Sequence, residues 1–507
     1  MNGSRERKAG GPESGAGSGP VARKGGAAGA ASPEAARASV GPVRRRQVFY
    51  IPGFDPFPIR RYRELYRSES AAQARISGHD IVMEGVPGAP GRWRTFWRER
   101  AAGDAPVTRS DFVVLEWSDI VRRRMAGGVL AGYRALLTTL WRYVASGTFF
   151  RLLDLRRGPI LAALYPIVML VAQFLLAVLV AFGLFLGGRW AIGALAAAAG
   201  AAPPDLPAAG LALVAALAGA AGLLRWFWKH DGRFYAHYLM HDYAHSCSAA
   251  GRYPADLDRR IDAFADAIGR ALAAPDVDEV LVVGHSSGAH LAISAVARLL
   301  RQGRVPGSGA RLALLTLGHV VPMISFLPEA RQLRADLALL ARADRIFWLD
   351  VTAPGDVCTF ALCDPVAVSG MAPPGGQIWP RVISAAFSLT LAPERWRKLK
   401  WRFFRLHFQY LCAFDRPRGY DYFAITAGPE TLADRFAGRP SSPSRIATPR
   451  LPVADASADA KESADGAGVA APARGTGAAA PTIADPTITI RAAARAGAPA
   501  RRFGGRA

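Results

Sequence analysis

The longest stretch without charge constrains this chain more than any other feature of its sequence. Residues 160–186 contain no Asp, Glu, Lys or Arg, and Gln173 is their one strongly polar side chain. A helix needs about 20 apolar residues to cross the hydrocarbon core of a bilayer. Because a buried hairpin of a soluble protein seldom needs so long a run, we predict a transmembrane helix here.

A second apolar run follows at about 206–224 and ends in Arg225-Trp226-Phe227-Trp228-Lys229. Aromatic side chains with cations close by are typical of the membrane–water interface. The run is rich in Ala and Gly, which lets two membrane helices pack closely. We therefore predict a transmembrane hairpin over 151–229, with spans at about 160–186 and 206–228.

Cationic side chains lie on the outer side of both predicted spans. They are Arg151, Arg156, Arg157, Arg225, Lys229 and Arg233. The loop between the spans carries only Arg189 and Asp205, so the positive-inside rule places both flanks in the cytoplasm. Residues 1–46 lack the apolar core of a signal peptide. We expect an integral protein of a bacterial-type inner (cytoplasmic) membrane, with both termini cytoplasmic.

The charge of the whole chain also points to an anionic partner. The formal net charge is +23, which favours either nucleic acid or the acidic face of a membrane. Residues 395–405 interleave cations with aromatics, a pattern that can grip single-stranded nucleic acid. Beside a hairpin the same pattern favours a helix lying on anionic lipid head groups. We expect the lipid bilayer as partner and no nucleic acid, and the oligomeric state stays open.

The remaining sequence divides by composition. Segments 1–46 and 436–507 are dominated by Ala, Gly, Pro, Ser and Arg, so we predict disordered tails. The hairpin separates a first folded part, 47–150, from a second, 230–435. Apolar residues recur at helical spacing over 129–144. This spacing suits a helix at a membrane surface and equally a helix facing a core.

Three histidines are candidate metal ligands. His237, His241 and His245 share one helical face, and histidines so placed can bind a metal. No HExxH or cysteine pattern accompanies them, and the four cysteines lack metal-binding spacing. We therefore predict a polar helix face near the membrane, with no metal site and no cofactor.

Strands and helices alternate outside the hairpin. The apolar strand candidates show little polar alternation, which is typical of a mostly parallel sheet covered by helices on both faces. The predicted strands are 48–51, 112–115, 280–283, 312–317 and 346–351, and the later helices are 257–272, 289–300 and 331–341. The predicted fold class is therefore α/β, interrupted by the hairpin.

One turn of this α/β region carries a nucleophile motif. Ser286 stands in Gly284-His285-Ser286-Ser287-Gly288, between an apolar strand and a helix. Such a sharp strand-to-helix turn exposes the hydroxyl and directs backbone N–H groups of the helix toward developing negative charge. With 52 glycines, chance alone could supply the bare pattern, so its strand–turn–helix context carries the prediction.

A serine nucleophile needs a base, and the base needs an orienting acid. His319 and His407 follow the serine's own helix, and His407 is the better base because it comes after the last clear strand. Asp356, in the turn after strand 346–351, is the predicted acid. Asp350 and Asp364 are its rivals.

In these motifs the chain resembles the α/β-hydrolase superfamily, of the lipase/esterase-like kind, over 47–118 and 235–429. The resemblance implies an oxyanion hole made by the backbone N–H groups of Phe54 and Ser287. The first strand ends in Pro52-Gly53, whereas lipase-like members often carry His-Gly there.

The expected function follows from these features together. It is a membrane-anchored serine hydrolase acting on amphiphilic acyl esters or thioesters through Ser286, Asp356 and His407. The alternative is a catalytically silent membrane scaffold of the same fold, because fold alone does not establish activity.

Overall fold

A computed structural model describes residues 41–100, 107–201 and 205–452. The predicted disorder of residues 1–40 and 453–507 concerns positions outside this described part. The described chain begins and ends within the predicted tails, so both boundaries differ from the prediction. The first strand starts at Arg45, and residues 436–452 pack on the folded part, where Phe436 and Leu451 are buried.

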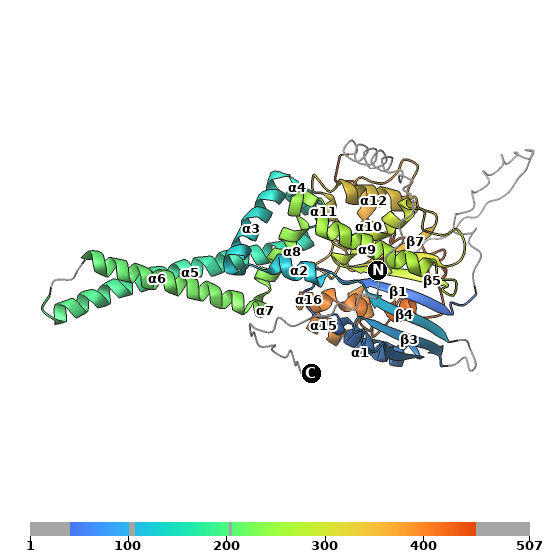
Figure 1. The fold of residues 1–507 in the computed structure, drawn as a ribbon, viewed down its shortest axis with the longest axis horizontal. Helices are drawn as coiled ribbons and strands as arrows, with labels where there is room; N and C mark the ends of the chain where they lie inside the picture. Colours follow the sequence, from blue (N-terminus) through green and yellow to red (C-terminus); the bar gives the residue numbers. More distant parts are fainter. Residues whose placement is uncertain (1–40, 101–106, 202–204, 453–507) are drawn as a thin grey trace, which may run out of the picture. The chain divides into compact units, whose positions relative to one another are not determined.

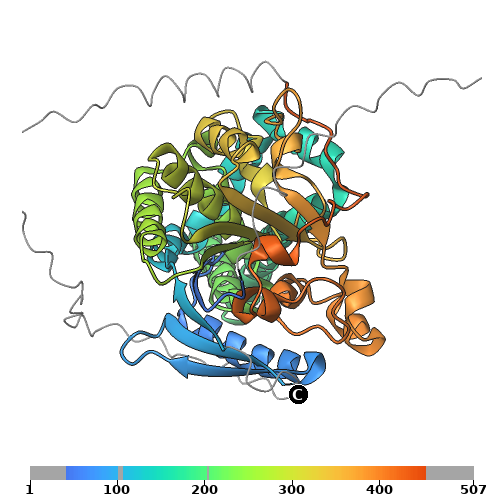
Figure 2. The same ribbon diagram turned by 90° about the vertical axis from the view of Figure 1, so that its right-hand side faces the viewer.

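An eight-stranded sheet forms the centre of the fold, with strand order β2-β3-β4-β1-β5-β6-β7-β8. The pairs from β4 through β8 are parallel, while β2 and β3 are antiparallel to their neighbours and lie at one edge (Figure 2). The bounds are β1 Arg45–Ile51, β2 His79–Gly85, β3 Arg92–Glu99, β4 Thr108–Val114, β5 Glu279–His285, β6 Arg311–Leu317, β7 Ile346–Thr352 and β8 Arg381–Ser384. The prediction of a mostly parallel α/β sheet is therefore confirmed.

Helices cover both faces of this sheet. Figure 1 shows α9, α10 and α12 on the opposite side from α1. Every residue of β5 and β7 is buried, which explains why these strands lack polar alternation. The bounds of these helices are α1 Arg60–Ser77, α9 Ala255–Leu272, α10 Gly288–Arg301 and α12 Arg331–Ala341.

A buried ion pair holds the start of β1 against β5. Arg46 Nε lies 2.5 Å from Glu279 Oε2, and both side chains are inaccessible to solvent. Arg46 also donates to the carbonyls of Gly428 and Glu430, while Glu279 Oε1 accepts the Leu432 N–H. A buried charge pair is tolerated when its remaining polar atoms are bonded. The pair therefore ties the sheet to the C-terminal segment.

Two helices are long and apolar enough to cross a membrane, and they run side by side (Figure 1). They are α5, Arg157–Ala198, and α6, Asp205–Lys229. The prediction of two such helices is confirmed. However, α5 has 42 residues, about twice what a bilayer requires, so Arg189 lies on the helix instead of in a loop.

Part of α5 packs on two neighbouring helices. Leu170 is buried against Ala135 and Leu136 of α3, Gly128–Ala145, and Met240 of α8, Ala236–Ser246. Large apolar side chains on another face of α3 stay exposed, among them Trp141. Helix α3 thus has one packed face and one exposed apolar face.

The prediction of a polar face on α8 is wrong. His237, His241 and His245 are all buried, and the His245 ring packs on Phe54 and Trp117. Burial lowers the pKa of all three imidazoles, that of His245 to about 4. They are neutral packing groups because α8 lies between α5 and the sheet domain.

The cationic and aromatic stretch 395–405 forms two short helices with a bend between them. These are α15, Pro393–Leu399, and α16, Phe403–His407. Trp401, in the bend, is 73% exposed. The described chain therefore presents aromatic rings to its surroundings beside the end of α16, where a single longer surface helix was expected.

Candidate active site

Ser286 occupies the turn between β5 and α10. Its φ is +57°, a left-handed conformation that non-glycine residues seldom adopt. The Ser286 N–H donates to the Leu317 carbonyl of β6 at 2.9 Å, which holds the turn against the neighbouring strand. Strained backbone that the surrounding structure enforces is concentrated at functional sites.

The end of β1 and its exit loop approach the strained turn so closely that two of the contacts require glycine. A Cβ on Gly288 would overlap the Ile51 carbonyl oxygen of β1. A Cβ on Gly53 would lie 3.0 Å from the Ser286 Cβ. The exit loop of β1 therefore lies directly against Ser286, and larger side chains at either position would push the two apart.

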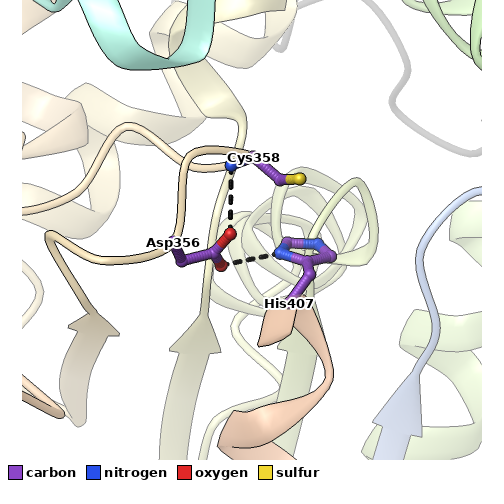
Figure 3. Close-up of side chains that lie close together, drawn as sticks. All are labelled: Asp356, Cys358 and His407. Atoms are coloured by element: carbon purple, nitrogen blue, oxygen red, sulfur yellow. Dashed lines mark hydrogen bonds and ion pairs between the residues drawn. The ribbon is translucent and has the colours of Figure 1, made fainter. Parts of the chain in front are cut away.

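Asp356 and His407 are joined by a hydrogen bond (Figure 3). His407 Nδ1 lies 2.8 Å from Asp356 Oδ2, and both side chains are buried. The Cys358 N–H donates to the other carboxylate oxygen at 3.0 Å. Asp356 follows β7, and His407 ends α16. Because the carboxylate accepts the Nδ1 proton, Nε2 of His407 is the nitrogen that can accept a proton.

Ser286 and His407 line one small cavity of about 80 Å³. Gly53 and Phe54 from the exit loop of β1 line it as well, together with Asp242 from α8. The structure thus brings the predicted nucleophile, base and exit loop to a single cavity, and Asp356 adjoins it through His407.

The rival residues lie elsewhere. His319 is buried and bonds the Cys363 carbonyl through Nε2 at 3.1 Å. Asp350 accepts the Thr316 hydroxyl proton at 2.6 Å, and Asp364 caps α13, Pro365–Val368. None of the three lines the Ser286 cavity among the described residues.

The predicted oxyanion donors are the backbone N–H groups of Phe54, in the exit loop of β1, and of Ser287, in the turn after Ser286. Trp117 Nε1 donates to the Pro52 carbonyl at 2.9 Å, and the Tyr238 hydroxyl bonds the Phe54 carbonyl. These bonds fix the exit loop that carries the Phe54 N–H. Within the described chain, neither this N–H nor that of Ser287 has a protein acceptor. Both N–H groups therefore remain free for a ligand oxygen.

His285 has a role that sequence reasoning missed. Its Nε2 lies 3.0 Å from the His407 carbonyl oxygen, and the two rings are 4.8 Å apart. Burial lowers the pKa of His285 to about 3, so it is neutral and donates this bond. His285, the residue before Ser286, thus anchors the backbone of the predicted base, a contact between distant segments that no local pattern predicts.

Asp242 was also missed. It lines the cavity from α8, and burial raises its pKa to about 7, although the nearby His407 opposes this rise. Its position depends on α8 packing beside the exit loop of β1. In the sequence it lies among the histidines, aromatics and small residues of α8 and has no motif of its own.

A metal site is poorly supported at this position. Candidate ligand atoms of Asp356, Cys358 and His407 lie within 4.8 Å of one another. Burial, however, raises the pKa of the Cys358 thiol well above its ordinary value, and only a thiolate is a strong metal ligand. Asp356 and His407 already bond each other, so these residues do not fit a metal centre.

Comparison with known protein families, with curated proteins and with solved structures found no match for this chain. The geometry of the site is therefore the main indication of what this chain does.

The buried carboxyl group of Asp350 predicts how the free energy of unfolding depends on pH. Burial raises its pKa to about 8, against about 4 in an unfolded chain, so the folded state binds a proton that the unfolded state lacks between these values. Wild-type stability should fall as pH rises through this window. Asn cannot ionise, so its free energy of unfolding lacks this decrease. Relative to the wild type, we expect the free energy of unfolding of Asp350→Asn to rise by at most about 1.4 kcal/mol per pH unit.

Thermal unfolding of the detergent-solubilised protein from pH 5 to 8 measures this difference. The neighbouring His319, 3.5 Å from Asp350, is present in both proteins. Parallel profiles for the two proteins would show that Asp350 is already ionised in the folded protein at pH 5, which would contradict the raised pKa.

Proposed function

We propose that this chain is a membrane-anchored serine hydrolase of the α/β-hydrolase type, which cleaves ester or thioester bonds of acyl substrates. The hydrogen bond between Asp356 and His407, beside a cavity lined by Ser286, carries the proposal. A histidine oriented by a carboxylate near a strained serine is the arrangement that nucleophilic acyl transfer needs.

In the first step the Ser286 hydroxyl attacks the carbonyl carbon of the substrate. His407 Nε2 takes the hydroxyl proton, and Asp356 stabilises the imidazolium through Nδ1–H. The carbonyl oxygen gains negative charge, which the N–H groups of Phe54 and Ser287 are proposed to bind. His407 then returns the proton to the departing alcohol or thiol, which leaves an acyl group on Ser286.

In the second step water removes the acyl group. His407 accepts a proton from the water, the hydroxide adds to the carbonyl carbon, and the bond to Ser286 Oγ breaks. The proton returns to the serine oxygen, and a carboxylic acid is released. Every proton in the cycle passes through His407, so the chemistry calls for no further cofactor.

The proposed location follows from the two apolar helices. Both helices are long and apolar enough to cross a membrane. In this proposal they cross a bacterial-type inner membrane, and the sheet domain and both termini lie in the cytoplasm. The support is the charge distribution around the hairpin, with Arg151 and Arg156 before it and Arg233 after it.

The nucleophile is tested by labelling membranes that contain the full chain with a fluorophosphonate probe. Wild type should be labelled, and Ser286→Ala should lose labelling completely because the probe bonds to the serine oxygen. Ser68→Ala, an exposed position on α1, is the control that should keep labelling. If Ser286→Ala is still labelled, Ser286 is not the nucleophile that reacts with the probe. If the wild type is not labelled, the catalytically silent scaffold becomes the better interpretation.

The base is tested by exchanging the two histidines separately. His407→Gln should slow labelling by about a hundredfold or more, the scale of general-base catalysis. His319→Gln should keep a rate within about tenfold of wild type, provided that its thermal unfolding shows a folded protein. The reverse result would make His319 the base and would remove the role of the Asp356 bond.

The orientation is tested with a reporter that is active only in the cytoplasm, fused to the C-terminus. We expect activity from this fusion and none when the same reporter replaces the residues between α5 and α6. Activity of the second fusion with silence of the first would reverse the assigned topology.

A further inference from the structure

A large apolar groove lies beside the Ser286 cavity. Its volume is about 690 Å³, far more than the 80 Å³ of the cavity itself. The first turns of α5, the short helix α7 (Asp231–Phe234), α8 and α16 form its walls. The site described above uses little of this space, because the reacting carbonyl and serine need only the small cavity.

The groove and the cavity share walls. Ala162 of α5, Leu239 and Tyr243 of α8, and Phe404 of α16 line both. A ligand with its carbonyl carbon at Ser286 could therefore extend into the groove without crossing the protein core. Of these four residues, Ala162 has the smallest side chain, so a larger side chain there would narrow the junction.

The groove also adjoins the apolar helix. Gly158, Leu161 and Tyr165 line it, and α5 continues from them without a charged residue as far as Gly188. On the other wall Trp401 and Phe403 are exposed, as aromatic side chains at a membrane interface are. The groove thus lies where a lipid could pass from the bilayer to the serine.

Three arginines line this otherwise apolar groove: Arg233, Arg402 and Arg405. Their neighbours Arg395 and Arg397 pair with Asp415 and Glu394. In the described part of the chain, the groove arginines have no carboxylate partner. Guanidinium groups bind phosphate through paired, charge-assisted hydrogen bonds. Their side chains are exposed, as a site for a lipid head group requires.

We propose that the substrate is an anionic phospholipid of the surrounding bilayer, with its acyl chain in the groove and its phosphate on Arg233, Arg402 and Arg405. This inference rests on the proposed hydrolase function. The ester bond between the acyl carbonyl and the glycerol oxygen breaks. Water supplies a hydroxyl to the acyl group and a proton to the glycerol oxygen, so the products are a fatty acid and a lysophospholipid.

The test uses the full chain reconstituted in phosphatidylcholine vesicles. Two fluorogenic lipids with identical acyl chains are compared, one with an anionic phosphoglycerol head group and one with a zwitterionic phosphocholine head group. Because the protein is already in the membrane, a difference in rate reports recognition and not recruitment. We expect the wild type to cleave the anionic lipid about tenfold faster or more.

Separate substitutions test the binding of the lipid head group and the binding of the acyl chain. Replacing Arg233, Arg402 and Arg405 by Gln should abolish the preference for the anionic lipid, whereas Arg397→Gln, which removes one charge on α15 outside the groove, should keep it. Ala162→Trp should reduce cleavage of the long-chain ester at least tenfold relative to a short-chain ester with the same head group. The second comparison is made within one variant, so it is unaffected by the yield of folded protein.

The outcomes distinguish this inference from the function on which it rests. Absence of fluorophosphonate labelling in the wild type would overturn both. Labelling of Ser286 with no cleavage of either lipid, or with equal rates on the two head groups, would overturn the anionic-lipid assignment and leave the hydrolase intact. If Ala162→Trp reduces cleavage of the long-chain and short-chain esters equally, the acyl chain does not occupy the groove.

Discussion

The close approach of β1 to the turn at Ser286 is the constraint on which the rest of the site depends. Gly288 packs against the Ile51 carbonyl, and Gly53 packs against Ser286 itself. These contacts leave no room for another backbone path, so the serine is held at positive φ. The same contacts place the exit loop of β1, with the Phe54 N–H, beside the serine hydroxyl.

The predicted base, His407, comes from a different part of the chain. His407 comes from a late, short helix whose position depends on the His285 bond to its carbonyl and the Asp356 bond to its ring. One contact fixes the backbone and the other fixes the ring. Both are buried, where hydrogen bonds are not exchanged for bonds with water. The strand that leads to Ser286 therefore helps to position His407.

The inserted hairpin packs against the helices that surround Ser286. Helix α5 packs on α3 and α8, and α8 supplies Tyr238 and Asp242 to the surroundings of the serine. The groove beside the serine has α5 as one wall. The apolar helix and the site are thus parts of one packed structure, in keeping with a substrate that arrives from the membrane.

The sequence by itself determined the α/β class, the two long apolar helices and the turn at Ser286. Each depends on short-range patterns: apolar runs, their lengths and glycine spacing. Order along the chain also pointed to Asp356 and His407, and these two lie bonded together, although their catalytic role stays a prediction. Local composition failed at the boundaries, because Arg46 and Phe436 are buried by partners that are distant in sequence.

Only the tertiary structure decided which groups meet. The burial of the α8 histidines, the raised pKa of Asp242 and the bond from His285 to His407 all arise where segments far apart in the chain are packed together. The groove has the same origin, since α5, α8 and α16 each contribute one wall. Periodicity reveals which face of a helix is apolar, but it does not reveal what covers that face.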